Sequence, residues 1–164
     1  MERTEIMGPE IVRRKIVRMA WEIVEDHHLE KKLWLVGIAS RGLAIAKILE
    51  KQLRAIHSIE VETIELSVQK SNPWESPIQT QLDQENLENS TVIIVDDVLN
   101  SGRTLCYAIC HFMKRPVRQI HSAVLVNRSH AQFPVRATYV GTHLSTTLQE
   151  HVEVDPDALR VYLQ

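Results

Sequence analysis

The chain has 164 residues, of which 44% are hydrophobic, and a formal net charge of −2. This length suits one substantial core and is short for two, so we expect a single domain over residues 1–164. The balanced charge argues against a globally basic nucleic-acid binder, and neither a secretory signal nor an apolar stretch of roughly 20 residues is present, so we expect a soluble, cytoplasmic protein without membrane association.

Two hydrophobic periodicities alternate along the chain, one typical of amphipathic helices and one of buried strands. They predict, in order, a helix from Pro9 to about His27, a strand over 33–39, a helix over 43–53, strands over 59–68 and 92–95, a helix over 103–113, and strands over 120–126 and 136–140. The short apolar segments 152–154 and 159–163 are expected to add edge structure. Strands that alternate with helices predict an α/β fold with a mainly parallel sheet, in which ligands bind beyond the carboxyl ends of the strands.

Residues 69–90 form the one long polar segment without periodicity. A loop of this length inside a compact domain is usually a lid, a binding loop or a disordered segment. We expect it to close over a ligand site, with Lys70 and Trp74 in the closing segment. Trp74 is equally consistent with an anchor that packs the loop onto the body.

The most informative segment joins a buried strand to a helix through a turn of small residues. The strand ends in Asp96 and Asp97, which are placed to accept hydrogen bonds from vicinal sugar hydroxyls or to hold a hydrated Mg²⁺. Gly102 lets the backbone approach a ligand, Ser101 and Thr104 offer hydroxyl groups, and the N–H groups of the helix start favour phosphate. The segment therefore predicts a ribose phosphate site, whereas an isolated Asp-Asp pair would more often be a solvated strand end.

This pattern resembles the phosphoribosyl pyrophosphate (PRPP) signature of type I phosphoribosyltransferases, and residues 37–42 resemble the short pyrophosphate-binding loop of that family. The resemblance implies their fold, a mainly parallel twisted sheet flanked by helices with a flexible loop and a small hood. The implied catalytic residues are Asp96, Asp97 and Arg41, and the two aspartates are the implied Mg²⁺ ligands, directly or through water. The residues implied to bind PRPP or a nucleotide are Ser40, Arg41, Gly42, Asp96, Asp97, Val98, Leu99, Asn100, Ser101, Gly102, Arg103 and Thr104.

Two further segments, 11–14 and 123–141, resemble the family of bifunctional pyrimidine-operon regulators and uracil phosphoribosyltransferases. Members bind uridine nucleotides and attenuate transcription by binding a pyrimidine-operon mRNA, and many convert uracil and PRPP to UMP and pyrophosphate. The resemblance implies PRPP with Mg²⁺, uracil or UMP and UTP as ligands, an operon mRNA as a further partner, and a homodimer or homotetramer. It places Arg128 and His130 on the base side of the pocket.

Departures from the family pattern leave alternatives open. The regulators carry an aromatic residue and Thr where this chain has Asn100 and Ser101, whereas purine-type relatives place an acid at the first of these positions. A neutral amide cannot take a proton, so hypoxanthine or guanine is a less expected substrate, although salvage of another base remains an alternative. The segment 67–74 lacks the Tyr-Arg-Asp-Asp-like run of the family, which leaves open a nucleotide-sensing regulator without turnover. The candidate cations for RNA are Arg13, Arg14, Lys15 and Arg18.

Cysteine and histidine give no comparable signal. Cys106 and Cys110 are four residues apart in a predicted helix and supply only two metal ligands, so we expect small buried core residues. The eight histidines are scattered without ligand spacing, and we expect surface or core roles for them.

Overall fold

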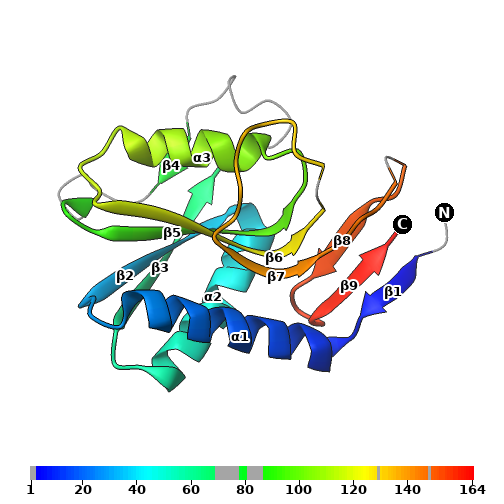
Figure 1. The fold of residues 1–164 in the computed structure, drawn as a ribbon, viewed down its shortest axis with the longest axis horizontal. Helices are drawn as coiled ribbons and strands as arrows, with labels where there is room; N and C mark the ends of the chain where they lie inside the picture. Colours follow the sequence, from blue (N-terminus) through cyan, green and yellow to red (C-terminus); the bar gives the residue numbers. More distant parts are fainter. Residues whose placement is uncertain (1–2, 69–77, 81–86, 129, 148) are drawn as a thin grey trace.

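A central sheet lies between helices on its two faces, and a smaller sheet is built from both ends of the chain (Figure 1). The structure is a computed structural model that describes residues 3–68, 78–80, 87–128, 130–147 and 149–164. Its elements are β1 (Thr4–Met7), α1 (Pro9–His27), β2 (Lys32–Ile38), α2 (Ala39–Ile56), β3 (Glu60–Ser67), β4 (Gln79–Thr80), β5 (Thr91–Leu99), α3 (Arg103–Met113), β6 (Gln119–Asn127), β7 (Tyr139–His143), β8 (Val152–Asp155) and β9 (Arg160–Leu163).

The strand order of the main sheet determines where a ligand can bind. Among the described residues the order is β4-β3-β2-β5-β6-β7, with all neighbours parallel except β4, which is antiparallel to β3. The chain leaves β2 toward one edge and, from β5, builds toward the other edge. The order therefore reverses between β2 and β5, and a crevice at their carboxyl ends is the usual ligand position in such sheets.

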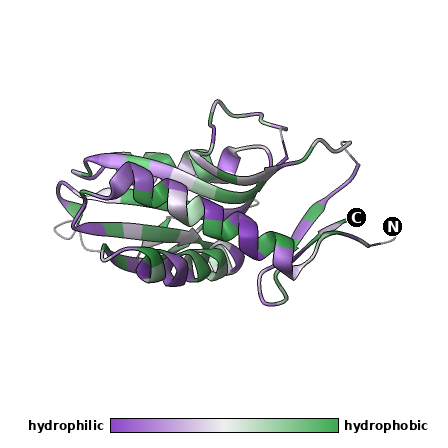
Figure 2. Ribbon diagram, turned by 60° about the horizontal axis from the view of Figure 1, so that its bottom comes forward, coloured by the Kyte–Doolittle hydropathy of each residue, from purple (hydrophilic) through white to green (hydrophobic). Residues whose placement is uncertain are grey.

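The core explains why the strands appear as continuous apolar runs. In β5 the side chains of Ile93 and Val95 join the cluster beneath α1 and α2, while Val92 and Ile94 join the cluster beneath α3. A strand that is covered on both faces has no solvent side, so its hydrophobic residues need not alternate with polar ones. Figure 2 shows the contrast, with hydrophobic residues dominating the central strands and hydrophilic residues interspersed along the helices.

The three-stranded sheet β1-β9-β8, which we call the hood, lies beside the carboxyl ends of the main strands. Its strands are antiparallel, and they bring residues near the two chain ends together, as in the pairing of Thr4 with Leu163. Val154 and Val161 attach the hood to the main core. The terminal segments 152–154 and 159–163, which were expected at the sheet edge, therefore form a separate layer.

The predicted helices from Pro9 to His27 and over 103–113 are confirmed, as is the mainly parallel sheet. The predicted end of the strand at Val95 is wrong, because β5 continues to Leu99 and pairs with β6 as far as Asn127. The helix expected to begin at residue 43 begins at Ala39, so Ser40-Arg41-Gly42 form its first turn and not a separate loop.

Other element boundaries also need correction. The strand expected over 136–140 occupies residues 139–143, and the segment 69–90 is not a continuous loop, since β4 pairs with Leu66 and Ser67. The closing role expected for Lys70 and Trp74 lies outside the described residues. The expected burial of the cysteines is wrong, because α3 buries Leu105, Ala108 and Phe112 and leaves Cys106 partly exposed and Cys110 exposed. No helix among the described residues has the length and apolar composition needed to cross a membrane.

Candidate functional site

A cavity of about 310 Å³ lies at the carboxyl end of β5, beside the position where the strand order reverses. This volume is at the lower end of the range for small-molecule sites. The lining residues come from the end of β5, the following turn, α3, β6 and the hood, and they are Asp96, Asp97, Val98, Leu99, Asn100, Ser101, Gly102, Thr104, Leu105, Val124, Arg128, His151 and Val152.

Asp96 and Asp97 are both only 5% exposed although they carry carboxylates. The backbone N–H of Asp97 donates to Oδ1 of Asp96 across 3.0 Å, which fixes one oxygen of the pair. Gly42 brings α2 close to them, since a Cβ at this position would lie 2.6 Å from the carbonyl oxygen of Val95 and 3.2 Å from Cα of Asp96. Glycine is thus required for the first turn of α2 to pack against the strand end that carries the aspartates.

The turn after β5 is shaped to present a helix start to the cavity. Gly102 has φ 84°, and it caps α3 without a side-chain hydrogen bond. The backbone carbonyl of Ser101 accepts hydrogen bonds from the N–H groups of Gln132 (2.8 Å) and Phe133 (3.1 Å), so a second loop holds the turn in place. Oγ of Ser101 accepts a hydrogen bond from the backbone N–H of Arg103 across 3.3 Å. The other N–H groups of the helix start are a favourable position for an anion, and Thr104 lines the cavity next to them.

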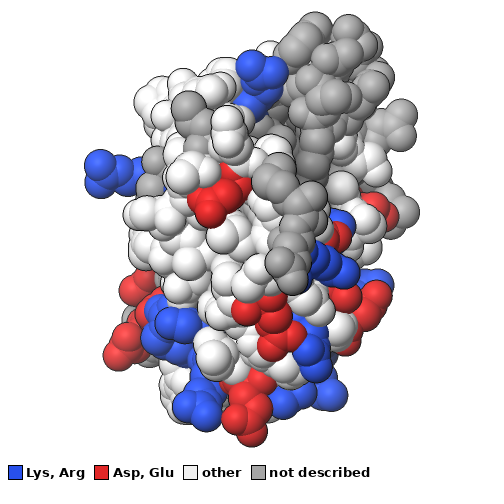
Figure 3. All heavy atoms as spheres, turned by 90° about the vertical axis from the view of Figure 1, so that its right-hand side faces the viewer, with Lys and Arg blue, Asp and Glu red and all other residues white. Residues whose placement is uncertain are grey.

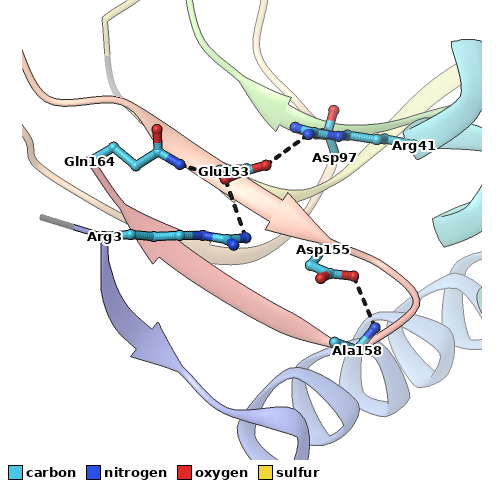
Figure 4. Close-up of polar contacts among 7 residues, drawn as sticks. All are labelled: Arg3, Arg41, Asp97, Glu153, Asp155, Ala158 and Gln164. Atoms are coloured by element: carbon cyan, nitrogen blue, oxygen red, sulfur yellow. Dashed lines mark hydrogen bonds and ion pairs between the residues drawn. The ribbon is translucent and has the colours of Figure 1, made fainter. Parts of the chain in front are cut away.

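Arg41 links the main sheet to the hood (Figure 4). Its Nη2 donates to Oε1 of Glu153 across 3.0 Å, and its Nη1 lies 3.9 Å from Oδ2 of Asp97. The other oxygen of Glu153 accepts a hydrogen bond from Nε2 of Gln164 (2.5 Å) and lies 3.3 Å from Nη2 of Arg3. The guanidinium is therefore held between a carboxylate of β5 and a carboxylate of β8.

Arg128 lines the cavity directly after the end of β6. Its side chain is almost fully buried, at 4% exposure, and it donates to Oδ1 of Asn100 (3.2 Å), Oγ1 of Thr146 (2.8 Å) and the carbonyl oxygen of Thr147 (2.9 Å). Glu150 follows on the same segment, where hydrogen bonding by the backbone N–H of Thr147 lowers its pKa and the charge of Arg128 adds to the effect. The segment that contains these residues thus wraps around a buried cation.

The structure brings most of the predicted site residues to this cavity. Asp96 to Gly102, Thr104 and Arg128 line it, whereas Ser40, Arg41, Gly42, Arg103 and His130 do not. Arg41 and Gly42 lie beside the aspartates, as described above. The guanidinium of Arg103 lies over the Phe133 ring, 5.4 Å from its centroid, and Nε2 of His130 lies 2.8 Å from the carbonyl oxygen of Thr146, behind Arg128.

Sequence reasoning missed the contribution of the hood. His151 and Val152 line the cavity, and Glu153 holds Arg41, although they are about 50 positions away from the turn in the sequence. Each belongs to a segment without a motif, and only the folded arrangement brings them to the site.

A family model for the phosphoribosyl transferase domain matches residues 5–158. The chain belongs to the phosphoribosyltransferase family. "Bifunctional protein PyrR" of Streptococcus thermophilus (strain CNRZ 1066) is 36% identical to this phosphoribosyltransferase over 157 residues, covering 94% of this chain and 90% of the relative. "Pyrimidine operon regulatory protein" of Lactococcus lactis subsp. lactis (strain IL1403) is 36% identical over 160 residues, with the same coverage.

Solved structures confirm the fold of this phosphoribosyltransferase. The hypoxanthine phosphoribosyltransferase of Trypanosoma cruzi superimposes with a TM-score of 0.80 at 19% identity, covering 98% of this chain and 95% of the other. A hypoxanthine-guanine phosphoribosyltransferase (hpt-2) of Bacillus anthracis gives a TM-score of 0.75 at 17% identity, covering 97% and 95%. The expected type I phosphoribosyltransferase fold is confirmed, while identities this low carry no information about the base.

Proposed function

We propose that this phosphoribosyltransferase transfers the phosphoribosyl group of PRPP to uracil, which yields UMP and pyrophosphate. The observation that carries the proposal is the cavity itself, where two nearly buried aspartates and the start of α3 lie together at the strand-order reversal. The pyrimidine-operon relatives favour a pyrimidine base. Asn100 agrees with this choice, because its amide cannot take the proton that an acid at this position would take from a purine ring.

Each part of PRPP has a matching group in the proposed site. Asp96 and Asp97 accept hydrogen bonds from the two ribose hydroxyls, and the segment from Val98 to Thr104 holds the 5-phosphate with its backbone N–H groups and hydroxyls. Arg41, with the backbone of Ser40 and Gly42, binds the diphosphate, for which the planar guanidinium is suited. We assign the base to the side where Arg128 lines the cavity; His130 does not line it and contacts Thr146, one of the acceptors of Arg128.

The aspartates also suit the Mg²⁺ that accompanies PRPP in our proposal. Mg²⁺ prefers oxygen ligands and is commonly bound by one or two carboxylates together with substrate phosphates. In the described part of the chain no group of three or more His, Cys, Asp or Glu side chains is arranged to hold a metal ion. We therefore expect Mg²⁺ to bind with PRPP and not alone, and to neutralise charge on the diphosphate.

The main contribution of the protein to the reaction is to position the reactants. The bond between C1 of PRPP and the diphosphate breaks, its electron pair leaves with the diphosphate, N1 of uracil bonds to C1, and the N1 proton passes to solvent. Asp96 and Asp97 hold the ribose while positive charge develops at C1, and Arg41 stabilises the departing negative charge. Neither role requires a covalent intermediate with the protein.

The test is UMP formation from uracil and PRPP with Mg²⁺, followed by chromatography. Asp97→Asn removes one of the two carboxylate charges of the site and should reduce the rate by about two orders of magnitude or more, on the order of the loss when a transition-state contact is removed. Asp157→Asn, in the exposed turn between β8 and β9, is the matched control and should retain the parent rate. If the parent protein forms no more UMP than the Asp97→Asn variant does, the proposal is rejected.

A second candidate function, RNA-dependent regulation, is favoured by the similarity to proteins named as pyrimidine operon regulators. On α1, Arg13 and Arg14 are exposed, but Arg14 pairs with Glu10 and Arg18 pairs with Glu22. Figure 3, which views the hood side, shows cationic and acidic side chains interspersed over its lower part.

The regulatory role would be tested by filter binding to the pyrimidine-operon leader RNA of the source organism, with and without UMP, over a salt series. Phosphate contacts make affinity fall with salt, so salt-insensitive or absent binding would contradict this role. Arg13→Gln and Arg14→Gln together should weaken binding if α1 contributes.

A further inference from the structure

The starting point is the way in which the buried charge of Arg128 is accommodated. Its guanidinium donates to three neutral oxygens, on Asn100, Thr146 and Thr147. Among the described residues no carboxylate lies within ion-pair distance of it, although it is only 4% exposed. Buried arginines are usually paired with acids, so these neutral groups are strongly polarised by the cation.

This arrangement determines which way the Asn100 amide faces. A guanidinium has donors and no acceptor, so the atom that meets it across 3.2 Å must be the side-chain carbonyl oxygen. The usual ambiguity between the oxygen and nitrogen of an amide is therefore removed by chemistry. The NH₂ group lies on the other branch of the amide, on an exposed residue that lines the cavity, and no described residue accepts a hydrogen bond from it.

Asn100 lies on the β6 side of the aspartates. The backbone N–H of Arg128 donates to the carbonyl oxygen of Leu99 across 3.0 Å, which ties the end of β6 to the residue before Asn100. The donors suited to phosphate lie further along the turn, from Gly102 into α3. Asn100 and Arg128 thus form a wall of the cavity that offers hydrogen-bond donors.

We propose that Asn100, oriented by Arg128, is a specificity-determining residue. It selects a base that presents a carbonyl oxygen to the Asn100 amide over a base that presents an amino group there. The inference rests on the proposed function, because that function assigns the base to this side of the cavity. Uracil carries carbonyl oxygens at both positions where cytosine has one carbonyl and one amino group. An amino group that meets the Asn100 amide would bring two donors together and leave both without acceptors.

The test is isothermal titration with UMP and CMP, which share the ribose and phosphate and differ at the base edge. The ratio of their affinities isolates that edge, and we expect UMP to bind about tenfold to a hundredfold more tightly, on the scale of one unsatisfied hydrogen bond. Asn100→Asp retains an oxygen for Arg128 and offers the ligand an acceptor, so the preference should fall below threefold or reverse. Asn100→Ala should bring the ratio toward one without reversing it.

Gln132→Glu is the matched control, because it adds the same negative charge on an exposed residue outside the cavity lining. It should leave the ratio of UMP to CMP affinity as in the parent. A parent ratio near one, or an Asn100→Asp ratio equal to that of the parent, would overturn the inference while UMP formation from uracil still supports the proposed function. Absence of binding by both nucleotides would overturn the assignment of the cavity to ribose phosphate and both proposals with it.

Discussion

Arg41 in the first turn of α2 donates a 3.0 Å hydrogen bond to Glu153 of the hood, across 112 positions of sequence. The same guanidinium lies 3.9 Å from Asp97, so one cation lies between carboxylates of two different sheets. Arg3 and Gln164 hold the other oxygen of Glu153 (Figure 4). Residues near both chain ends therefore set the position of the cation that we assign to the diphosphate.

Glu153 carries a negative charge beside a site proposed for a diphosphate, so the two compete for Arg41. Glu153→Gln keeps an oxygen that accepts the hydrogen bond of Arg41 and removes the charge. We expect pyrophosphate to bind about threefold more tightly, a size typical of a partly exposed charge pair. UMP, which has no diphosphate, should bind with unchanged affinity, and titration calorimetry with the two ligands measures the difference.

The control for this variant is Glu5→Gln, which removes another hood carboxylate, one that pairs with Arg160. It should change neither affinity. In an Arg41→Gln background, Glu153→Gln should give no gain, because the cation over which the two anions compete is absent. Weaker pyrophosphate binding by Glu153→Gln would mean that Glu153 acts by holding Arg41 in place and not by competing for it.

Thr104 lines the cavity at the start of α3, where the 5-phosphate is assigned. Thr104→Ala removes one hydroxyl donor to a charged group and should weaken UMP and PRPP alike by roughly fivefold to tenfold. Calorimetry with both ligands tests the equality as well as the size of the loss. The control is Cys106→Ala on the same helix, because Cys106 does not line the cavity. If Thr104→Ala binds both ligands with the affinity of the parent, Thr104 does not belong to the phosphate site.

Ala39 begins α2 with φ 49°, in the left-handed region that disfavours a side chain. Ala39→Gly should relieve this strain and raise the free energy of unfolding by about 1 kcal/mol. Ala44→Gly, in the interior of the same helix, has no such strain and should lower it by about 0.5–1 kcal/mol. Urea denaturation compares the two, and a loss of stability in both variants would show that the backbone strain at residue 39 is negligible.

The local part of the site was predictable because its chemistry is contiguous in sequence. The two aspartates and the turn to Thr104 occupy nine consecutive positions, and a buried strand and a helix start flank them. The hood contribution was not predictable, because Glu153 meets Arg41 only through the pairing of four-residue strands that carry no motif. Arg128 and Asn100 entered the prediction through the family resemblance, and the hydrogen bond between them was identified only from the structure.

The errors in the fold have similar causes. Two carboxylates made the strand seem to end at Val95, yet backbone pairing with β6 continues to Leu99 because hydrogen bonding along a ladder does not depend on side-chain polarity. The strand expected over 136–140 was displaced by three residues. Alternation alone does not fix the ends of a strand, and here the pairing of Tyr139 with Ala123 sets the start.

His111 on α3 gives a prediction for the dependence of stability on pH. Burial lowers the pKa of His111 to about 4, and the charges of Arg115 and Lys114 add to the effect. Its Nε2 is buried without a partner among the described residues. Because the folded pKa lies below the unfolded value of about 6.5, the unfolded chain takes up the proton first, and stability is lost as the pH falls from about 6.5 toward 4.

His111→Phe removes this titrating group, so the free energy of unfolding should fall less between pH 7 and pH 5 than in the parent. Some slope remains, since burial also lowers the pKa of His27 and His121, whose rings lie 4.8 Å apart. Urea denaturation at a series of pH values measures the slope. Ile109→Val on the same helix adds no ionisable group and should lower the free energy of unfolding by about 1 kcal/mol at every pH, without changing the slope. A parent slope retained in His111→Phe would show that the pKa of His111 is the same in the folded and the unfolded chain.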